Sequence, residues 1–170
     1  MHTLKLIKDG VIYVAFVSNG RSGTEWEAHF DCRGIELSLN ARKVLNSPKF
    51  KTSRAGTAKP VAILKGEMFS DGDRITKNIR AKATELKFNK IDIETECLIR
   101  DGLTNKAINS LGLNWIVGMH EPVDIDGDPY LLTAFASDAV PWLGTRCDCP
   151  VHRWRRGDGF AFDASQVLKA

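Results

Sequence analysis

The apolar residues of this chain stand in short runs, and the longest of them, Val11 to Val17, covers seven residues. A helix that spans a bilayer takes about 20 apolar residues, so none of these runs is long enough to cross a membrane. Short apolar runs bounded by Gly, Pro or Asp-Gly are typical of β-strands, whereas apolar residues at every third or fourth position are typical of helices. Both patterns occur in this chain, so the sequence predicts an α+β fold.

The chain has 170 residues, which fits one domain, and its 43% hydrophobic and 26% charged residues are ordinary for a globular protein. The opening residues, "MHTLKLIKDG", have no apolar segment behind their charges, so no secretory signal is visible. We therefore expect a cytoplasmic protein, with export by another route left open. The four cysteines are irregularly spaced, which favours free thiols over a disulfide framework.

The expected domain divides into three segments. They are mixed strands and helix at 1–66, a helical segment at 67–112, and an antiparallel sheet at 113–170 that presents a recognition-like loop at 143–159.

Within the first segment, the pattern predicts a hairpin whose second strand is Trp26–Phe30. Within the second, the clearest helix is expected at 73–88, capped by Ser70, Asp71 or Asp73.

The types of charged residue change near residue 122. After Glu121 there is no further glutamate, and between Lys106 and Lys169 there is no lysine. Four arginines instead crowd into eleven positions, from Arg146 to Arg156. Lysine and glutamate are depleted at binding interfaces, whereas arginine and tryptophan are enriched at their hot spots. The change predicts a solubilised scaffold followed by a contact surface.

The stretch "RCDCPVHRWRRGDGF", residues 146–160, is the candidate for that surface. Arginine offers planar bidentate hydrogen bonds and stacking, and tryptophan and histidine add contact area at low entropic cost. We expect a non-catalytic module that binds a protein or a small ligand. The residues expected to bind it are Arg146, His152, Arg153, Trp154, Arg155, Arg156 and Asp158.

Motifs of hydrolytic enzymes have little support in the sequence. His120-Glu121 begins like a zinc-protease motif, but Asp124 stands where the second histidine of that motif is required. The G-x-S-x-G turn of serine hydrolases does not occur.

Cys147, Cys149 and His152 suggest an alternative function, zinc binding. Thiolate and imidazole are zinc ligands, and a fourth ligand would complete a tetrahedral site. The C-x-C-x₂-H spacing departs from the usual zinc knuckle, and the fold would have to supply His120 or Cys97 as the fourth ligand. A zinc protein, structural or hydrolytic, stays open on these residues.

The basic first half of the chain suggests a second alternative, nucleic-acid binding. The helix expected at 73–88 carries Arg74, Lys77, Arg80 and Lys87 on one face, and such a face could follow phosphates. No aromatic residues interleave with them for base stacking, so a solvated helix face is the favoured interpretation.

The stretch "LGTRCDCPVHRWRRGD", residues 143–158, resembles the diversified region of variable proteins made by diversity-generating retroelements. In that family, mutated adenines yield residues such as Asn, Ser, Asp, Gly, His, Arg, Tyr and Cys, and this stretch departs from the pattern only at Trp154. "GDGFAF" is similar to the short strand that ends such domains. The resemblance covers the last fifty or so residues and implies a C-type-lectin-like fold that holds a variable binding surface. The longer part of the chain also resembles short bacterial proteins without an assigned activity.

Overall fold

The computed structural model describes residues 6–168, which form a single α+β domain around one mixed sheet of nine strands. The strand order is β1-β2-β4-β9-β5-β7-β8-β3, and β6 pairs with β7 outside this path. The strands are β1 (Leu6–Lys8), β2 (Val11–Val17), β3 (Glu36–Leu37), β4 (Ala58–Lys65), β5 (Trp115–Gly118), β6 (Val123–Ile125), β7 (Asp128–Ala136), β8 (Pro141–Cys147) and β9 (Asp158–Asp163).

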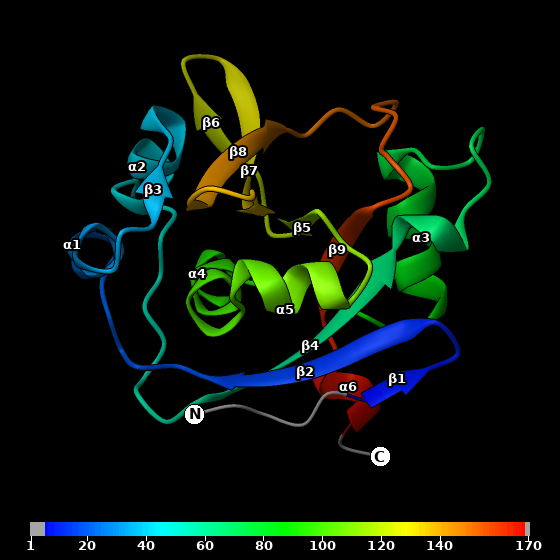
Figure 1. The fold of residues 1–170 in the computed structure, drawn as a ribbon, viewed down its shortest axis with the longest axis horizontal. Helices are drawn as coiled ribbons and strands as arrows, with labels where there is room; N and C mark the ends of the chain where they lie inside the picture. The colour runs from blue at the N-terminus through cyan, green and yellow to red at the C-terminus, as the bar shows by residue number, and fades with distance from the viewer. Residues whose placement is uncertain (1–5, 169–170) are drawn as a thin grey trace.

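The helices pack on the two faces of this sheet. They are α1 (Gly23–Cys32), α2 (Leu39–Leu45), α3 (Thr76–Glu85), α4 (Ile93–Gly102), α5 (Asn105–Ser110) and α6 (Ser165–Leu168), with a turn of 3₁₀ helix at Gly66–Met68. Figure 1 shows α4 and α5 across the middle of the molecule, α1 and α2 beside β3, and α3 at the opposite end. Among residues 6–168, no helix combines the length and the apolar character that a bilayer-spanning segment needs.

The core residues assign each helix to a face. Ile99 of α4 and Ile108 of α5 pack with Ile12, Val61 and Ile116 on one face of the sheet. The first two helices and the start of α4 extend this layer over β7 and β8. On the other face, Ile79 and Ala83 of α3 pack against β4 and β9. The same cluster buries Val117 of β5 and Leu131 of β7 on this second face. Its open part is therefore the end of β5, β7 and β8 that holds the half-buried Trp115, Phe135 and Trp142.

The predicted α+β fold is confirmed, but the third segment differs from the expected antiparallel sheet. Strand β9 runs parallel to β5 and inserts between β5 and β4, so the C-terminal strands and the N-terminal strands share one sheet. Strand β3 is also parallel to β8. Alternation along a strand specifies which residues share a face, but it carries no information about the direction of the neighbouring strand.

The expected hairpin strand Trp26–Phe30 is wrong, because these residues lie in helix α1. Ser22 accepts a hydrogen bond from the backbone of Glu25, and the Glu25 carboxylate accepts one from the backbone of Ser22. This capping box starts the helix. Trp26 and Phe30 are then one turn apart, and both are fully buried.

Helix α3 begins later than expected and without a side-chain cap. The loop that follows β8 supplies acceptors instead: the carbonyls of His152 and Pro150 accept hydrogen bonds from the backbone N–H groups of Thr76 and Lys77. In the opposite direction, the N–H of Trp154 donates to the carbonyl of Arg74. These bonds fix the candidate stretch against the N-terminus of α3.

Two fully buried ionisable side chains accept hydrogen bonds from the backbone of β7. The N–H of Leu132 donates to Nε2 of His120, and the N–H of Ala134 donates to Oε1 of Glu96. Burial lowers the pKa of His120 to about 4, although the carboxylates of Asp148, Asp92 and Glu121 favour its protonation. Burial likewise raises the pKa of Glu96 well above its ordinary value. Burial therefore disfavours the charged form of both groups.

Candidate functional site

A row of aromatic side chains crosses the open part of the sheet. The strand register places Trp115 beside Phe135, and Phe135 beside Trp142, so the three residues lie at one level on β5, β7 and β8. The centroids of the Trp115 and Phe135 rings are 4.2 Å apart. All three side chains are half-buried. We call Trp115, Phe135 and Trp142 the aromatic row, and Asp158 continues it on β9.

Arg146 lies over this row. Its guanidinium carbon is 4.0 Å from the centroid of the Trp115 ring, within the range of a cation–π contact. Two positions before it on β8, Gly144 shares its face of the sheet, and a Cβ there would meet no atom within 4 Å. The surface next to Arg146 is therefore open at Gly144.

The loop between β8 and β9 closes the other side of the site. Trp154 is 7% exposed and packs edge-on against Phe160, while its indole N–H donates to Oγ1 of Thr76 over 2.9 Å. The ring of the exposed His152 contacts Trp154 edge-on, and the two ring centroids are 4.4 Å apart. Trp154 is therefore a core residue that fixes the loop, and His152 is the part of this pair that faces solvent.

Asp158 forms the base of the site. It is only 5% exposed, and its Oδ2 accepts a 2.8 Å hydrogen bond from the backbone N–H of Arg155. Burial raises the pKa of Asp158, although that hydrogen bond and the charges of Arg155, Arg146 and His152 lower it in part. When it is ionised, the Asp158 carboxylate can accept a hydrogen bond from a ligand.

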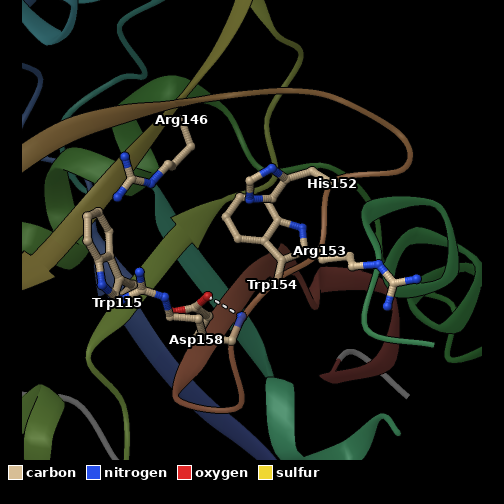
Figure 2. A pocket seen from close by; sticks show the side chains of 7 residues that line it. Trp115, Arg146, His152, Arg153, Trp154 and Asp158 are labelled. Atoms are coloured by element: carbon tan, nitrogen blue, oxygen red, sulfur yellow. Dashed lines mark hydrogen bonds between the residues drawn. The ribbon is translucent and has the colours of Figure 1, made fainter. Parts of the chain in front are cut away.

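These residues surround a cavity of about 300 Å³, drawn in Figure 2. We call it the first cavity; it is lined by Trp115, Arg146, His152, Arg153, Trp154, Arg155 and Asp158. Figure 2 shows Arg146 facing Trp115 on one side, His152 and Trp154 on the other, and the Asp158 carboxylate between them. The guanidinium group of Arg153 is directed away from the cavity.

The structure therefore brings together all but one of the seven residues selected from the sequence. The exception, Arg156, is exposed and lies outside the lining of the first cavity. Sequence reasoning missed Trp115, which is 31 positions from Arg146 along the chain. The alternation in β5 indicates which face Trp115 shares, but only the pairing of β5 with β9 and β7 brings it beside the arginines.

The arginines of the candidate stretch are not neutralised by the protein. Within residues 6–168, no salt bridge involves Arg146, Arg153, Arg155 or Arg156, and all four are exposed. Elsewhere on the molecule, Arg33, Arg42, Arg74 and Arg80 each pair with a carboxylate. The guanidinium groups at the candidate site remain available to an anionic ligand.

A second cavity of about 650 Å³ adjoins the first, and the two have Trp115 and Arg155 in common. Its other lining residues come from the end of α5 and the turn after β7, namely Asn109, Gly112, Leu113, Asn114, Phe135, Ala136, Ser137 and Asp138. The concave surface therefore continues beyond the first cavity as far as Phe135 of the aromatic row.

The zinc alternative gains no support from this geometry. Cys147 is exposed and Cys149 is half-buried. The part of Cys147 that is removed from water raises the pKa of its thiol. In the part of the chain that the structure describes, no three His, Cys, Asp or Glu side chains are grouped so that they could hold a metal ion. Zinc binding by Cys147, Cys149 and His152 stays a prediction.

The basic helix face is also less available than expected. Arg74 is buried, and its Nε donates to the carbonyl of Gly66 over 2.8 Å. Arg80 pairs with Asp148 at 2.8 Å. Two of the four basic side chains of this face are therefore engaged within the protein.

The chain matches no family model, no curated protein and no solved structure in comparisons with known proteins. The resemblance of residues 143–158 to a diversified region stays a prediction.

Proposed function

We propose that this protein is a non-catalytic binding module whose first cavity takes a ligand that combines a flat ring with an anionic group. The observation that carries the proposal is the cation–π contact of Arg146 with Trp115, 4.0 Å from the ring centroid, beside arginines that form no ion pair within residues 6–168. Guanidinium groups bind carboxylates, sulfonates and phosphates through paired hydrogen bonds, and their planes stack on rings.

The lining supports binding by its residue types. Tryptophan, arginine, histidine and aspartate stack, form hydrogen bonds and pair charges, and arginine and tryptophan dominate the hot spots of known complexes. A volume of about 300 Å³ lies at the small end of the range for ligand pockets. The buried Asp158 adds selectivity, because a ligand seated against it has to present a hydrogen-bond donor there.

Isothermal titration calorimetry with naphthalene disulfonate, and with inorganic sulfate as an anion without a ring, tests the proposal. We expect the native protein to bind naphthalene disulfonate at least about tenfold more tightly than sulfate, because stacking adds to charge pairing. The double substitution Arg146→Ala/Arg155→Ala should weaken binding of the ringed probe by tenfold or more, the usual range for hot-spot residues.

Arg54→Ala provides a matched control. Arg54 is exposed, lies in the loop before β4, and lines neither cavity. Its substitution should leave both affinities unchanged. Equal binding of the probe by the native protein and the Arg146/Arg155 double variant would overturn the proposal, as would an equal loss in Arg54→Ala.

A further inference from the structure

We infer that the ligand of the open sheet face is a single-stranded nucleic acid, with one nucleotide in the first cavity and its neighbours along the aromatic row. This inference rests on the proposed function, because it assigns a chemical class to the ligand of the same site. It depends on three features of the site: the length of the concave surface, the spacing of its rings and the distribution of its charges.

The concave surface is longer than a small ligand needs. The first cavity alone holds about 300 Å³, and the second adds about 650 Å³ across the shared Trp115 and Arg155. A single compact ligand would fill one of these volumes and leave the other empty. A chain-like ligand that passes over Trp115 would occupy both.

The rings are placed to stack successive bases. Trp142 lies two strands from Trp115, so these two residues are about 10 Å apart across the sheet, given a strand spacing of about 4.8 Å. Arg146 already covers one face of Trp115, and its guanidinium plane offers a second stacking surface. Bases of a single strand expose their faces to such platforms, whereas bases within a duplex are already stacked on each other.

The charges follow the same surface. Arg146 and Arg155 line the first cavity, and Arg153 and Arg156 lie exposed on the loop that borders it. The acids among the lining residues of the two cavities are Asp158, which is buried, and Asp138, which lines the second cavity alone. Phosphates can therefore pair with the border of the groove while Asp158 accepts a hydrogen bond from a base N–H group.

The test uses the full chain and a fluorescein-labelled oligothymidylate of about ten nucleotides, within the site sizes of single-strand binding domains. Fluorescence anisotropy at several salt concentrations should give binding that weakens as salt rises. The same sequence as a duplex should bind at least about tenfold more weakly. Heparin and polyglutamate serve as competing polyanions without bases.

Trp142→Ala separates this inference from the proposed function, because Trp142 lines neither cavity. We expect a loss of about 5- to 100-fold in oligonucleotide affinity, the effect of removing one stacking platform, with unchanged binding of naphthalene disulfonate. Trp142→Tyr should restore most of the affinity. Leu39→Ala, at an apolar residue of α2 that is 71% exposed, is the control and should change neither.

A second variant covers the case in which Trp142→Ala impairs folding. Arg156→Ala removes one exposed side chain and should flatten the dependence of log affinity on log salt by roughly 0.7, the slope of one lost phosphate contact. The probe affinity should persist in this variant, since Arg156 lies outside the lining of the first cavity.

Three outcomes would overturn the inference while leaving the proposed function intact, provided naphthalene disulfonate still binds. They are equal affinity for the duplex, equal affinity for heparin or polyglutamate, and an oligonucleotide affinity insensitive to both variants. If neither the small probe nor the oligonucleotide binds, the proposed function fails as well.

Discussion

The guanidinium carbon of Arg146 lies 4.0 Å from the centroid of the Trp115 ring, and the tilted rings of Trp115 and Phe135 have centroids 4.2 Å apart. The two residues of this cation–π pair come from β8 and β5, which do not pair with each other. Their contact joins the arginine-rich stretch to the open sheet face, and the first prediction depends on it.

Arg146→Lys should lower the affinity for naphthalene disulfonate by roughly 3- to 10-fold, measured by calorimetry. Lysine retains the charge but lacks the planar group that stacks on Trp115 and pairs with an anion through two hydrogen bonds. Arg54→Lys is the control, because Arg54 is exposed and lines neither cavity, so its replacement should have little effect. An unchanged affinity in Arg146→Lys would mean that charge alone acts at this position.

Gly118→Ala should lower the free energy of unfolding by roughly 1–3 kcal/mol, measured by urea denaturation. A Cβ at Gly118 would lie 2.8 Å from Oε2 of Glu96 and 3.0 Å from its Cβ and Cγ. Glu96 is fully buried and is held by a hydrogen bond from the Ala134 N–H. Gly144→Ala is the control: the space around its Cβ is open, so we expect a change within about 0.5 kcal/mol. Equal effects of the two substitutions would contradict this account of β5.

The stability of the protein should fall as the pH drops from 6.5 to 4, in part because of His120. Its pKa is lowered to about 4 in the folded protein, so in this range the unfolded chain takes up a proton that the folded protein refuses. The difference from the ordinary value of 6.5 corresponds to about 3 kcal/mol, lost in full below pH 4.

His120→Gln isolates this contribution, because glutamine does not titrate and its amide oxygen can accept the Leu132 N–H bond. Urea denaturation at a series of pH values should give the variant a shallower decline between pH 6.5 and 4 than the native protein. Identical slopes would show that His120 does not titrate in this way.

Ser22→Ala should cost about 1 kcal/mol of stability, because it removes the side-chain acceptor that begins α1. Ser22→Thr keeps a hydroxyl group and should cost much less. Thermal melting of the two variants provides the measurement. A Ser22→Ala variant with the melting temperature of the native protein would argue against the capping box. That box distinguishes this helix from the hairpin strand indicated by the sequence pattern.

Elemental analysis of protein purified without added metal tests the zinc alternative. Because Cys147, Cys149 and His152 are not grouped as ligands in the described part of the chain, we expect zinc well below one ion per chain. Stoichiometric zinc that disappears in Cys147→Ser/Cys149→Ser would instead support a metal site and displace the proposed binding function.

The candidate site could be predicted to the extent that its residues are close in sequence. Arg146, His152, Arg153, Arg155 and Asp158 lie within thirteen positions, at the end of one strand, in one loop and at the start of the next strand. Composition alone therefore located them, because a loop between two strands keeps such residues together in almost any fold. Arg156 was selected with them on the same grounds, yet it lies outside the cavity, because composition does not specify the direction of a side chain.

Local patterns were ambiguous where one stretch fits two structures. Trp26, Ala28 and Phe30 alternate as in a strand, but Trp26 and Phe30 are also one helical turn apart, and the Ser22–Glu25 capping box favours the helix. For α3, the sequence offered polar caps at Ser70 to Asp73, whereas the backbone carbonyls of Pro150 and His152 accept the first N–H bonds. Those acceptors are more than seventy residues away, so no local pattern could have indicated them.

By itself, the sequence determined the α+β class and the arginine-rich stretch, since hydrophobic periodicity and residue type are local properties of the chain. Only the tertiary structure decided that β9 inserts parallel to β5, which places Asp158 beside Trp115, Phe135 and Trp142 at one level of the sheet. Strand order and register arise from packing many distant segments at once, because each ladder gains its stability from cross-strand contacts that exist only in the assembled sheet.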